Sequence, residues 1–221
     1  EYLNEHPEVH RPILIAASLS CYGASIVSHE FDGDYIDMVS ESFLKESHRD
    51  RINCFLNLFK SKSENSSRDV PVPDMLLFET VPVLKEAQII CEVLEEELAA
   101  TPEFNHELPL PVIISFSCKN GEQTCHGETI TTCIEQLAKY PFVSAIGINC
   151  THPKYIGSLV KLVDSVIADR ERYTLHLMVY PNSGDVWDSS TSQFIPCAEN
   201  KYAEDYGQTL VQIVEQAVGQ P

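Results

Sequence analysis

The sequence A-I-G-I-N-C at residues 145–150 is an apolar run that stops at two polar residues, and L-M-V-Y-P-N-S-G at residues 177–184 repeats this pattern further along the chain. Apolar β-type runs that alternate with helical segments indicate a parallel sheet, in which ligands bind at the carboxyl ends of the strands. Cys150 is therefore a candidate thiolate ligand or nucleophile. Asn149 and Asn182 are candidates for the groups that orient a ligand around it.

The rest of the chain reads as repeated strand-then-helix units. The pattern of apolar residues predicts strands at residues 12–18, 74–79, 111–117, 143–149 and 175–180, and helices at residues 42–59, 83–100, 130–140, 154–168 and 204–218. Polar loops are expected at residues 60–69 and 101–109. Five such units running in one direction fit an open doubly wound sheet or a piece of an eightfold barrel. The Gly-rich phosphate-binding motifs follow none of the predicted strands, which favours the barrel.

Composition limits the class of protein. The chain has 221 residues, of which 43% are hydrophobic, so residues 1–221 are expected to form one domain with a sizeable core. A formal net charge of −18 argues against nucleic acids and anionic membranes as partners. No apolar stretch reaches the roughly 20 residues that span a bilayer. The first residues also lack the pattern of a signal peptide, so a cytoplasmic protein is expected.

The eight cysteines are scattered and form no C-x-x-C pair. Cys54, Cys91 and Cys133 fall beside apolar residues in predicted helices, where a thiol usually behaves as a small hydrophobic side chain. We expect these three to be buried and unreactive. Cys125 and His126 are adjacent and form a possible metal pair, although their place in a loop rich in turn residues favours a structural role.

Seven short motifs resemble those of the homocysteine S-methyltransferase family, and they occur in the family's order. They are A-S-L-S-C-Y-G-A at 17–24, E-F-D-G-D-Y at 30–35, H-R-D-R at 48–51, F-E-T-V-P at 78–82, S-F-S at 115–117, G-I-N-C at 147–150 and Y-P-N-S-G at 180–184. Each motif is weak by itself, but seven in order are specific. The fourth and the last motifs fit the branch that uses S-methylmethionine or S-adenosylmethionine better than the branch that uses betaine.

The resemblance implies an α/β fold, namely a partial TIM (β/α)8 barrel of about five central strand–helix units. Family members begin with a strand that carries D-G-[GA] and end with one that carries G-G-C-C, and neither motif is found here. Residues 1–221 are therefore expected to be a single homocysteine-binding domain that lacks the N-terminal and C-terminal barrel strands.

The resemblance also implies a site and a reaction. The family transfers a methyl group from a sulfonium donor to zinc-bound homocysteine and so makes methionine. Cys150 would be one zinc thiolate, and a full site needs two further cysteines. Glu79 would receive the amino group of homocysteine, Asn149 and Asn182 would shape the pocket floor, and Tyr22 would line the donor side. No residue is assigned as the catalytic acid or base.

Other interpretations remain open at this stage. The chain could be a truncated, catalytically inactive homologue that binds a partner through uncovered strand edges. It could also be another barrel enzyme that uses Glu79 as an acid or base without metal. Cys150 could be a buried structural thiol, and Glu79 a carboxylate that favours the start of a helix. Tyr180 and Pro181 are expected to shape a turn. The methyl donor and the oligomeric state are not determined by the sequence.

Overall fold

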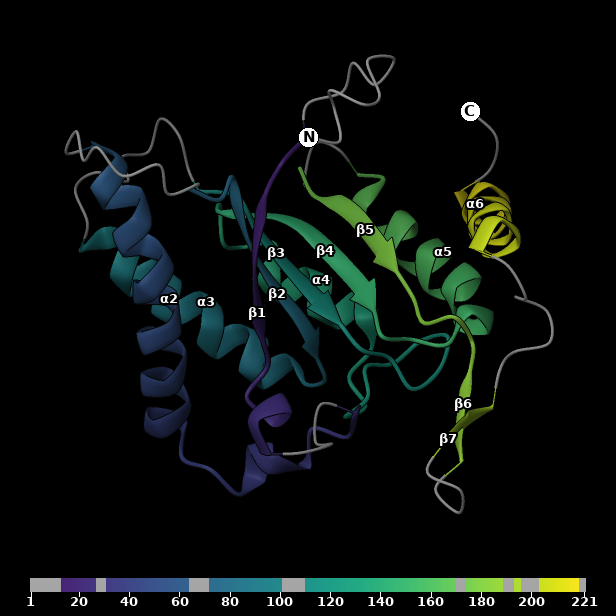
Figure 1. Ribbon diagram of the computed structural model, residues 1–221, viewed down its shortest axis with the longest axis horizontal. Helices are drawn as coiled ribbons and strands as arrows, with labels where there is room; N and C mark the ends of the chain where they lie inside the picture. The colour runs from purple at the N-terminus through teal and green to yellow at the C-terminus, as the bar shows by residue number, and fades with distance from the viewer. Residues whose placement is uncertain are drawn as a thin grey trace.

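A parallel sheet forms the centre of the molecule (Figure 1). The computed structural model describes residues 13–26, 31–63, 72–100, 110–169, 174–188, 193–195 and 203–218. The sheet has five strands in chain order: β1 (Ala16–Ser20), β2 (Met75–Val81), β3 (Val112–Phe116), β4 (Val143–Asn149) and β5 (His176–Tyr180). Each neighbouring pair is parallel, as the sequence predicts. A doubly wound fold would place an early strand in the middle of the sheet, so the open alternative is wrong.

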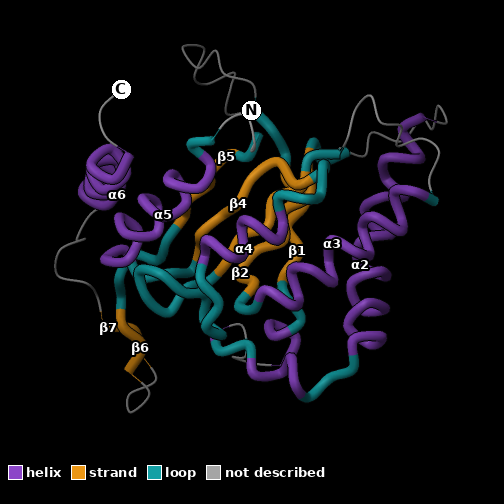
Figure 2. Tube along the Cα trace, turned by 180° about the vertical axis from the view of Figure 1, so that it is seen from behind, coloured by secondary structure: helices purple, strands orange, loops and turns teal. Residues whose placement is uncertain are grey.

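Helices follow the strands and lie beside one another in the same order. They are α2 (Glu41–Ser63), α3 (Leu84–Ala99), α4 (Ile130–Leu137), α5 (Ile156–Ile167) and α6 (Ala203–Val218). Seen from behind, α4 and α5 lie across one face of the sheet (Figure 2). A short hairpin of β6 (Val186–Asp188) and β7 (Gln193–Ile195) extends from the carboxyl side of the sheet (Figure 1). Consecutive β–α units in chain order are the arrangement of a (β/α)8 barrel, which confirms the predicted partial barrel.

Several predicted boundaries need correction. β1 begins at Ala16 rather than at residue 12, because Asp74 accepts a hydrogen bond from the Ile15 N–H through Oδ2 (2.7 Å) before the strand pairing starts. α2 continues to Ser63 instead of ending at residue 59. α4 ends at Leu137 rather than at residue 140, and a turn follows in which the Tyr140 N–H donates to the Leu137 carbonyl (3.1 Å). Residues 64–71 and 101–109, which include most of the two predicted loops, lie outside the described residues.

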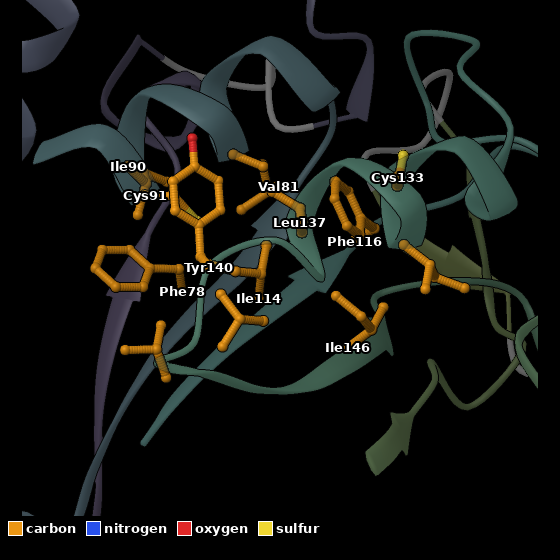
Figure 3. Packing of buried hydrophobic residues seen from close by; sticks show 14 of the residues in the cluster. Phe78, Val81, Ile90, Cys91, Ile114, Phe116, Cys133, Leu137, Tyr140 and Ile146 are labelled. Atoms are coloured by element: carbon orange, nitrogen blue, oxygen red, sulfur yellow. The ribbon is translucent and has the colours of Figure 1, made fainter. Parts of the chain in front are cut away.

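The main core fills the space between the sheet and its helices (Figure 3). Alternate residues of the strands point into it, and Phe78, Ile114, Phe116 and Ile146 are fully buried there. Burying each such side chain stabilises the fold by about 1.5–3 kcal/mol.

No helix in the described segments is both long and apolar enough to cross a membrane.

A buried carboxylate ties the loop after β1 to α2 and α3. Glu86 is fully buried and accepts hydrogen bonds from the Tyr22 backbone N–H (2.6 Å), the Tyr35 hydroxyl and His48 Nε2 (2.8 Å). Arg51 lies 2.9 Å from His48 Nδ1 and can only donate, so the His48 proton sits on Nε2. Burial, together with the charge of Glu86, raises the pKa of Tyr35. These contacts join Tyr35 of the second motif to His48 of the third motif through one carboxylate.

Replacing Glu86 should strongly destabilise the protein. In Glu86→Ala, three buried donors lose their acceptor, and we expect the free energy of unfolding to fall by about 3–5 kcal/mol. Urea denaturation measures this value. The control is Glu96→Ala, since Glu96 is half-exposed and its pair with Arg49 is worth less than about 1 kcal/mol. Equal losses in the two variants would contradict the proposed importance of the buried network.

Candidate functional site

Five polar side chains, one from each strand, gather on the sheet face opposite the helices and near the carboxyl ends of the strands. Their neighbours along each strand point into the main core, so strand alternation turns these five away from it. A smaller apolar cluster lies on the same face. We call the five residues the polar cluster: Ser18, Glu79, Ser115, Asn149 and Tyr180.

The amide of Asn149 links three strands. Its oxygen accepts hydrogen bonds from the Thr80 N–H (3.0 Å) and from the Ser115 hydroxyl (2.7 Å). Its nitrogen donates to Thr80 Oγ1 (2.8 Å) and approaches Cys150 Sγ (3.3 Å). The side chain is buried and uses both lone pairs and both protons. Its orientation is therefore fixed, and it holds the ends of β2, β3 and β4 together.

Two strained residues meet at this point. Thr80 (φ 58°) and Cys150 (φ 47°) are the non-glycine residues with positive φ in the described part of the chain. The register between β2 and β3 also shifts between Phe78 and Val81, around Thr80. The Thr80 hydroxyl accepts from Asn149 and donates to Cys150 Sγ (3.4 Å). Such backbone strain costs about 1–3 kcal/mol per residue and is common at functional sites, which marks this end of the sheet as the candidate site.

Glu79 of β2 and Tyr180 of β5 are two polar residues on the same face of the sheet. The Ser18 hydroxyl donates to Glu79 Oε1 and holds that oxygen in place. Burial raises the pKa of Tyr180, and the nearby charges of Glu79 and Cys150 raise it further. Thr80 follows Glu79 in β2 and its hydroxyl contacts Cys150 Sγ, so Glu79 and Cys150 lie at the same end of the sheet.

The structure places the other two predicted site residues at the rim or outside the cluster. Asn182 is exposed, and its N–H donates to the carbonyl of Thr151 (3.0 Å), the residue after Cys150. Tyr22 follows β1, and its ring packs edge-on against Tyr35, with the ring centroids 5.7 Å apart. The Tyr22 ring packs against the rings of Tyr35 and Phe43 beside the Glu86 network and lies outside the polar cluster.

The described residues do not form a complete metal site. Within these segments, no three His, Cys, Asp or Glu side chains come close enough together to hold an ion. His126 instead pairs with Glu128 (Nδ1 to Oε1, 3.0 Å), which supports a structural role for that loop. Zinc sites in proteins use three or four protein ligands. The sulfur of Cys150 suits zinc, but a single thiolate does not fit a zinc centre.

Sequence reasoning assigned no site role to four residues of this region: Ser18, Thr80, Ser115 and Tyr180. Strand alternation could have found Ser18, Ser115 and Tyr180, because each lies one position from a residue that faces the main core and therefore points to the opposite face of the sheet. The place of Thr80 in the site depends on its positive φ, which no pattern in the sequence predicts. Tyr180 is the last residue of β5, so the turn begins after it, at Pro181.

The fold is that of a partial barrel, and its polar cluster is a candidate small-molecule site at the carboxyl ends of the strands. The family model described as homocysteine S-methyltransferase matches residues 2–216, and the chain belongs to this family. The resemblance predicted from the seven motifs is thereby confirmed.

Individual relatives agree with the family assignment. The chain is 34% identical over 197 residues to homocysteine S-methyltransferase 3 of Arabidopsis thaliana, which covers 89% of this chain and 48% of the relative. It is 31% identical to homocysteine S-methyltransferase 3 of Zea mays, over 88% of this chain and 50% of the relative. The metallated homocysteine methyltransferase MmuM of Escherichia coli superposes with a TM-score of 0.61 at 29% identity, over 83% of this chain and 53% of that one. The chain thus spans about half the length of the curated relatives it matches.

Gly147 is required by the position of Ser115. A Cβ atom at residue 147 would lie 2.4 Å from Ser115 Oγ and 2.5 Å from its Cβ. Gly147→Ala should therefore displace Ser115 from Asn149 and lower the free energy of unfolding by about 1–3 kcal/mol. Gly207→Ala in α6 is the matched control, since nothing lies within 4 Å of its added methyl group. It should leave stability unchanged or raise it by up to about 1 kcal/mol in chemical denaturation. An equal response of both variants would contradict the close packing at Ser115.

The cysteines differ in burial, and one prediction about them is wrong. Cys91 and Cys133 are fully buried, as expected, whereas Cys54 is exposed because it lies on the outer side of α2. Burial raises the pKa of the Cys91 and Cys133 thiols, and it raises that of Cys118 to about 12. These buried thiols stay protonated at neutral pH and are poor nucleophiles.

Alkylation should separate these groups of cysteines. At pH 8 iodoacetamide should modify Cys54 in the folded protein, because a thiol reacts as the thiolate and needs access to the reagent. Cys91, Cys118 and Cys133 should react only after denaturation. Peptide mass spectrometry measures the extent at each site. If Cys91 reacted as fast as Cys54 under native conditions, the packing of α3 on the sheet would be contradicted.

Proposed function

We propose that this chain forms the homocysteine-binding part of a homocysteine S-methyltransferase that uses S-methylmethionine or S-adenosylmethionine as the methyl donor. The observation that carries the proposal is the shared position of a carboxylate, Glu79, and a thiol, Cys150, at one end of the sheet. Thr80 and Asn149 join them, because Thr80 follows Glu79 directly and contacts Cys150. The names of the relatives support the same substrate.

The carboxylate end would bind the amino group of homocysteine. A primary ammonium forms strong charge-assisted hydrogen bonds with a carboxylate. Ser18 holds one oxygen of Glu79, which leaves the other oxygen to face a ligand. Because the side chain is only half-buried, a ligand can reach it without unfolding the site.

The thiol end would receive the sulfur of homocysteine. A free thiol has a pKa of about 8.5 and is a weak nucleophile at neutral pH. Zinc in this family would deprotonate that sulfur, and Cys150 would supply one thiolate of a site whose other ligands are not among the described residues. The hydrogen bonds from Thr80 and Asn149 would fix the Cys150 sulfur in its rotamer.

The remaining predicted residues would complete the pocket. Asn149 forms its floor through the contacts described above, and Asn182 would enter from the loop that touches Thr151. Tyr22 would face the methyl donor, since an aromatic ring attracts a cationic sulfonium group. Its place beside the Glu86 network would make the donor side depend on that network.

A second candidate is an inactive homologue that binds a partner. Ile13, Leu14 and Ile15 support it, because they are 49–60% exposed just before the edge strand β1. Methyl transfer to homocysteine, assayed with the protein at its full natural length, separates the two candidates. Product formation that requires homocysteine and a sulfonium donor supports the enzyme, and its absence with an intact fold supports the partner-binding homologue.

Substitution of Glu79 tests the binding proposal. Glu79→Gln keeps the shape of the side chain but removes the charge, so we expect the affinity for L-homocysteine to fall by about 10–100-fold. Isothermal titration calorimetry measures it on the protein at full natural length. Glu96→Gln on α3 removes an exposed charge and should change the affinity less than about twofold. If Glu79→Gln bound L-homocysteine as tightly as the unsubstituted protein, the proposed binding of the amino group by Glu79 would be contradicted.

A further inference from the structure

Tyr180 carries a polar group that the fold does not use. Its hydroxyl oxygen is buried, and among the described residues it has no hydrogen-bond partner. Its ring packs against the small apolar cluster on the inner face of the sheet, opposite the helices. Buried polar groups are normally paired, and each exception calls for an explanation. A phenylalanine would fill the same apolar space without burying an unpaired hydroxyl.

The surroundings of this hydroxyl select the ligand. Glu79 and Ser115 both affect the pKa of Tyr180, although neither meets the geometry of a hydrogen bond with its hydroxyl. The Ser115 proton is engaged with Asn149 Oδ1, so the Ser115 oxygen can only accept a bond from the phenol. When the phenol turns its proton toward Ser115 in the ligand-bound protein, the phenol oxygen is left to accept a hydrogen bond. Next to the carboxylate of Glu79, such an acceptor fits a group with several N–H donors and a positive charge.

We propose that Tyr180 is a positioning residue for the amino group of the bound amino acid. Its hydroxyl oxygen accepts one N–H of the primary ammonium group that Glu79 binds, and the two side chains hold that group between β2 and β5. This inference rests on the proposed function, because it assumes that an amino acid occupies the site. The contact between the Tyr180 hydroxyl and the ammonium group fixes the orientation of the substrate about its Cα, so that the substrate sulfur points toward Cys150.

The inference predicts opposite effects on stability and on binding. Tyr180→Phe removes a hydroxyl that is unpaired in the free protein, so the denaturation midpoint should stay the same or rise. The same change removes an acceptor from the bound ammonium and should weaken L-homocysteine binding by about tenfold. A tyrosine with a purely structural role would not give this combination.

Tyr206 supplies the matched control. Its hydroxyl is 2.9 Å from the Pro181 carbonyl and 3.0 Å from the Asn182 carbonyl, so it is partnered in the free protein. Tyr206→Phe should therefore lower the denaturation midpoint, in contrast to Tyr180→Phe. A lower midpoint for Tyr180→Phe would overturn the inference, because it would mean that the hydroxyl already has a partner that stabilises the fold.

The chemical test uses two ligands with the protein at its full natural length. Calorimetry gives the affinities of the unsubstituted protein and of Tyr180→Phe for L-homocysteine and for 4-mercaptobutanoate, which lacks the amino group. We expect about a tenfold loss for homocysteine and less than a twofold loss for 4-mercaptobutanoate. An equal loss for the two ligands would overturn the inference, because the hydroxyl would then contact another part of the ligand.

Glu79→Gln, measured in parallel, separates this inference from the proposed function. If Glu79→Gln weakens homocysteine binding and Tyr180→Phe does not, the role proposed for Tyr180 is contradicted, whereas the proposed binding of the amino group by Glu79 is supported. If neither variant changes the affinity, or if the unsubstituted protein does not bind homocysteine, the proposed function fails and the inference fails with it.

Discussion

The amide side chain of Asn149 holds the carboxyl ends of β2, β3 and β4 in one arrangement. Its four hydrogen bonds reach Thr80, Ser115 and Cys150, and none of these contacts is interchangeable, because the oxygen only accepts and the nitrogen only donates. The strained backbones of Thr80 and Cys150 persist because this amide fixes both from the same point. Gly147 leaves the space that Ser115 needs to take part. The position of the candidate site thus depends on one buried polar side chain.

Much of the fold was predictable because its information is local. Apolar runs and amphipathic segments alternate along the chain, and each of the five strands and their helices was found within a few residues. The errors have physical causes that act over longer distances or through single residues. The Ile15 N–H binds the side chain of Asp74 just before β1, and a turn closed by the Tyr140 N–H on the Leu137 carbonyl follows the early end of α4. Cys54 is exposed because residues beside it on α2, rather than Cys54 itself, face the core.

The candidate site was predictable in outline only. Glu79, Asn149 and Cys150 stand at strand ends, and parallel strands deliver their ends to one edge, so their convergence follows from topology. The roles of Thr80 and Tyr180 were not predictable in this way. Thr80 acts through a positive φ and a register shift, and Tyr180 through a missing hydrogen bond, and both are properties of the folded chain. Glu86 was missed because a charged residue in an acidic helix normally faces solvent.

The central claim is that Glu79 and Cys150 hold the two ends of one amino acid. A crystal structure of the protein at full natural length with L-selenohomocysteine tests it most directly, because the anomalous scattering of selenium locates that atom without reference to the chain. The account predicts the selenium beside the Cys150 sulfur and the ligand nitrogen on the Glu79 carboxylate. Selenium away from Cys150, or a ligand amino group bound away from Glu79, would contradict the claim.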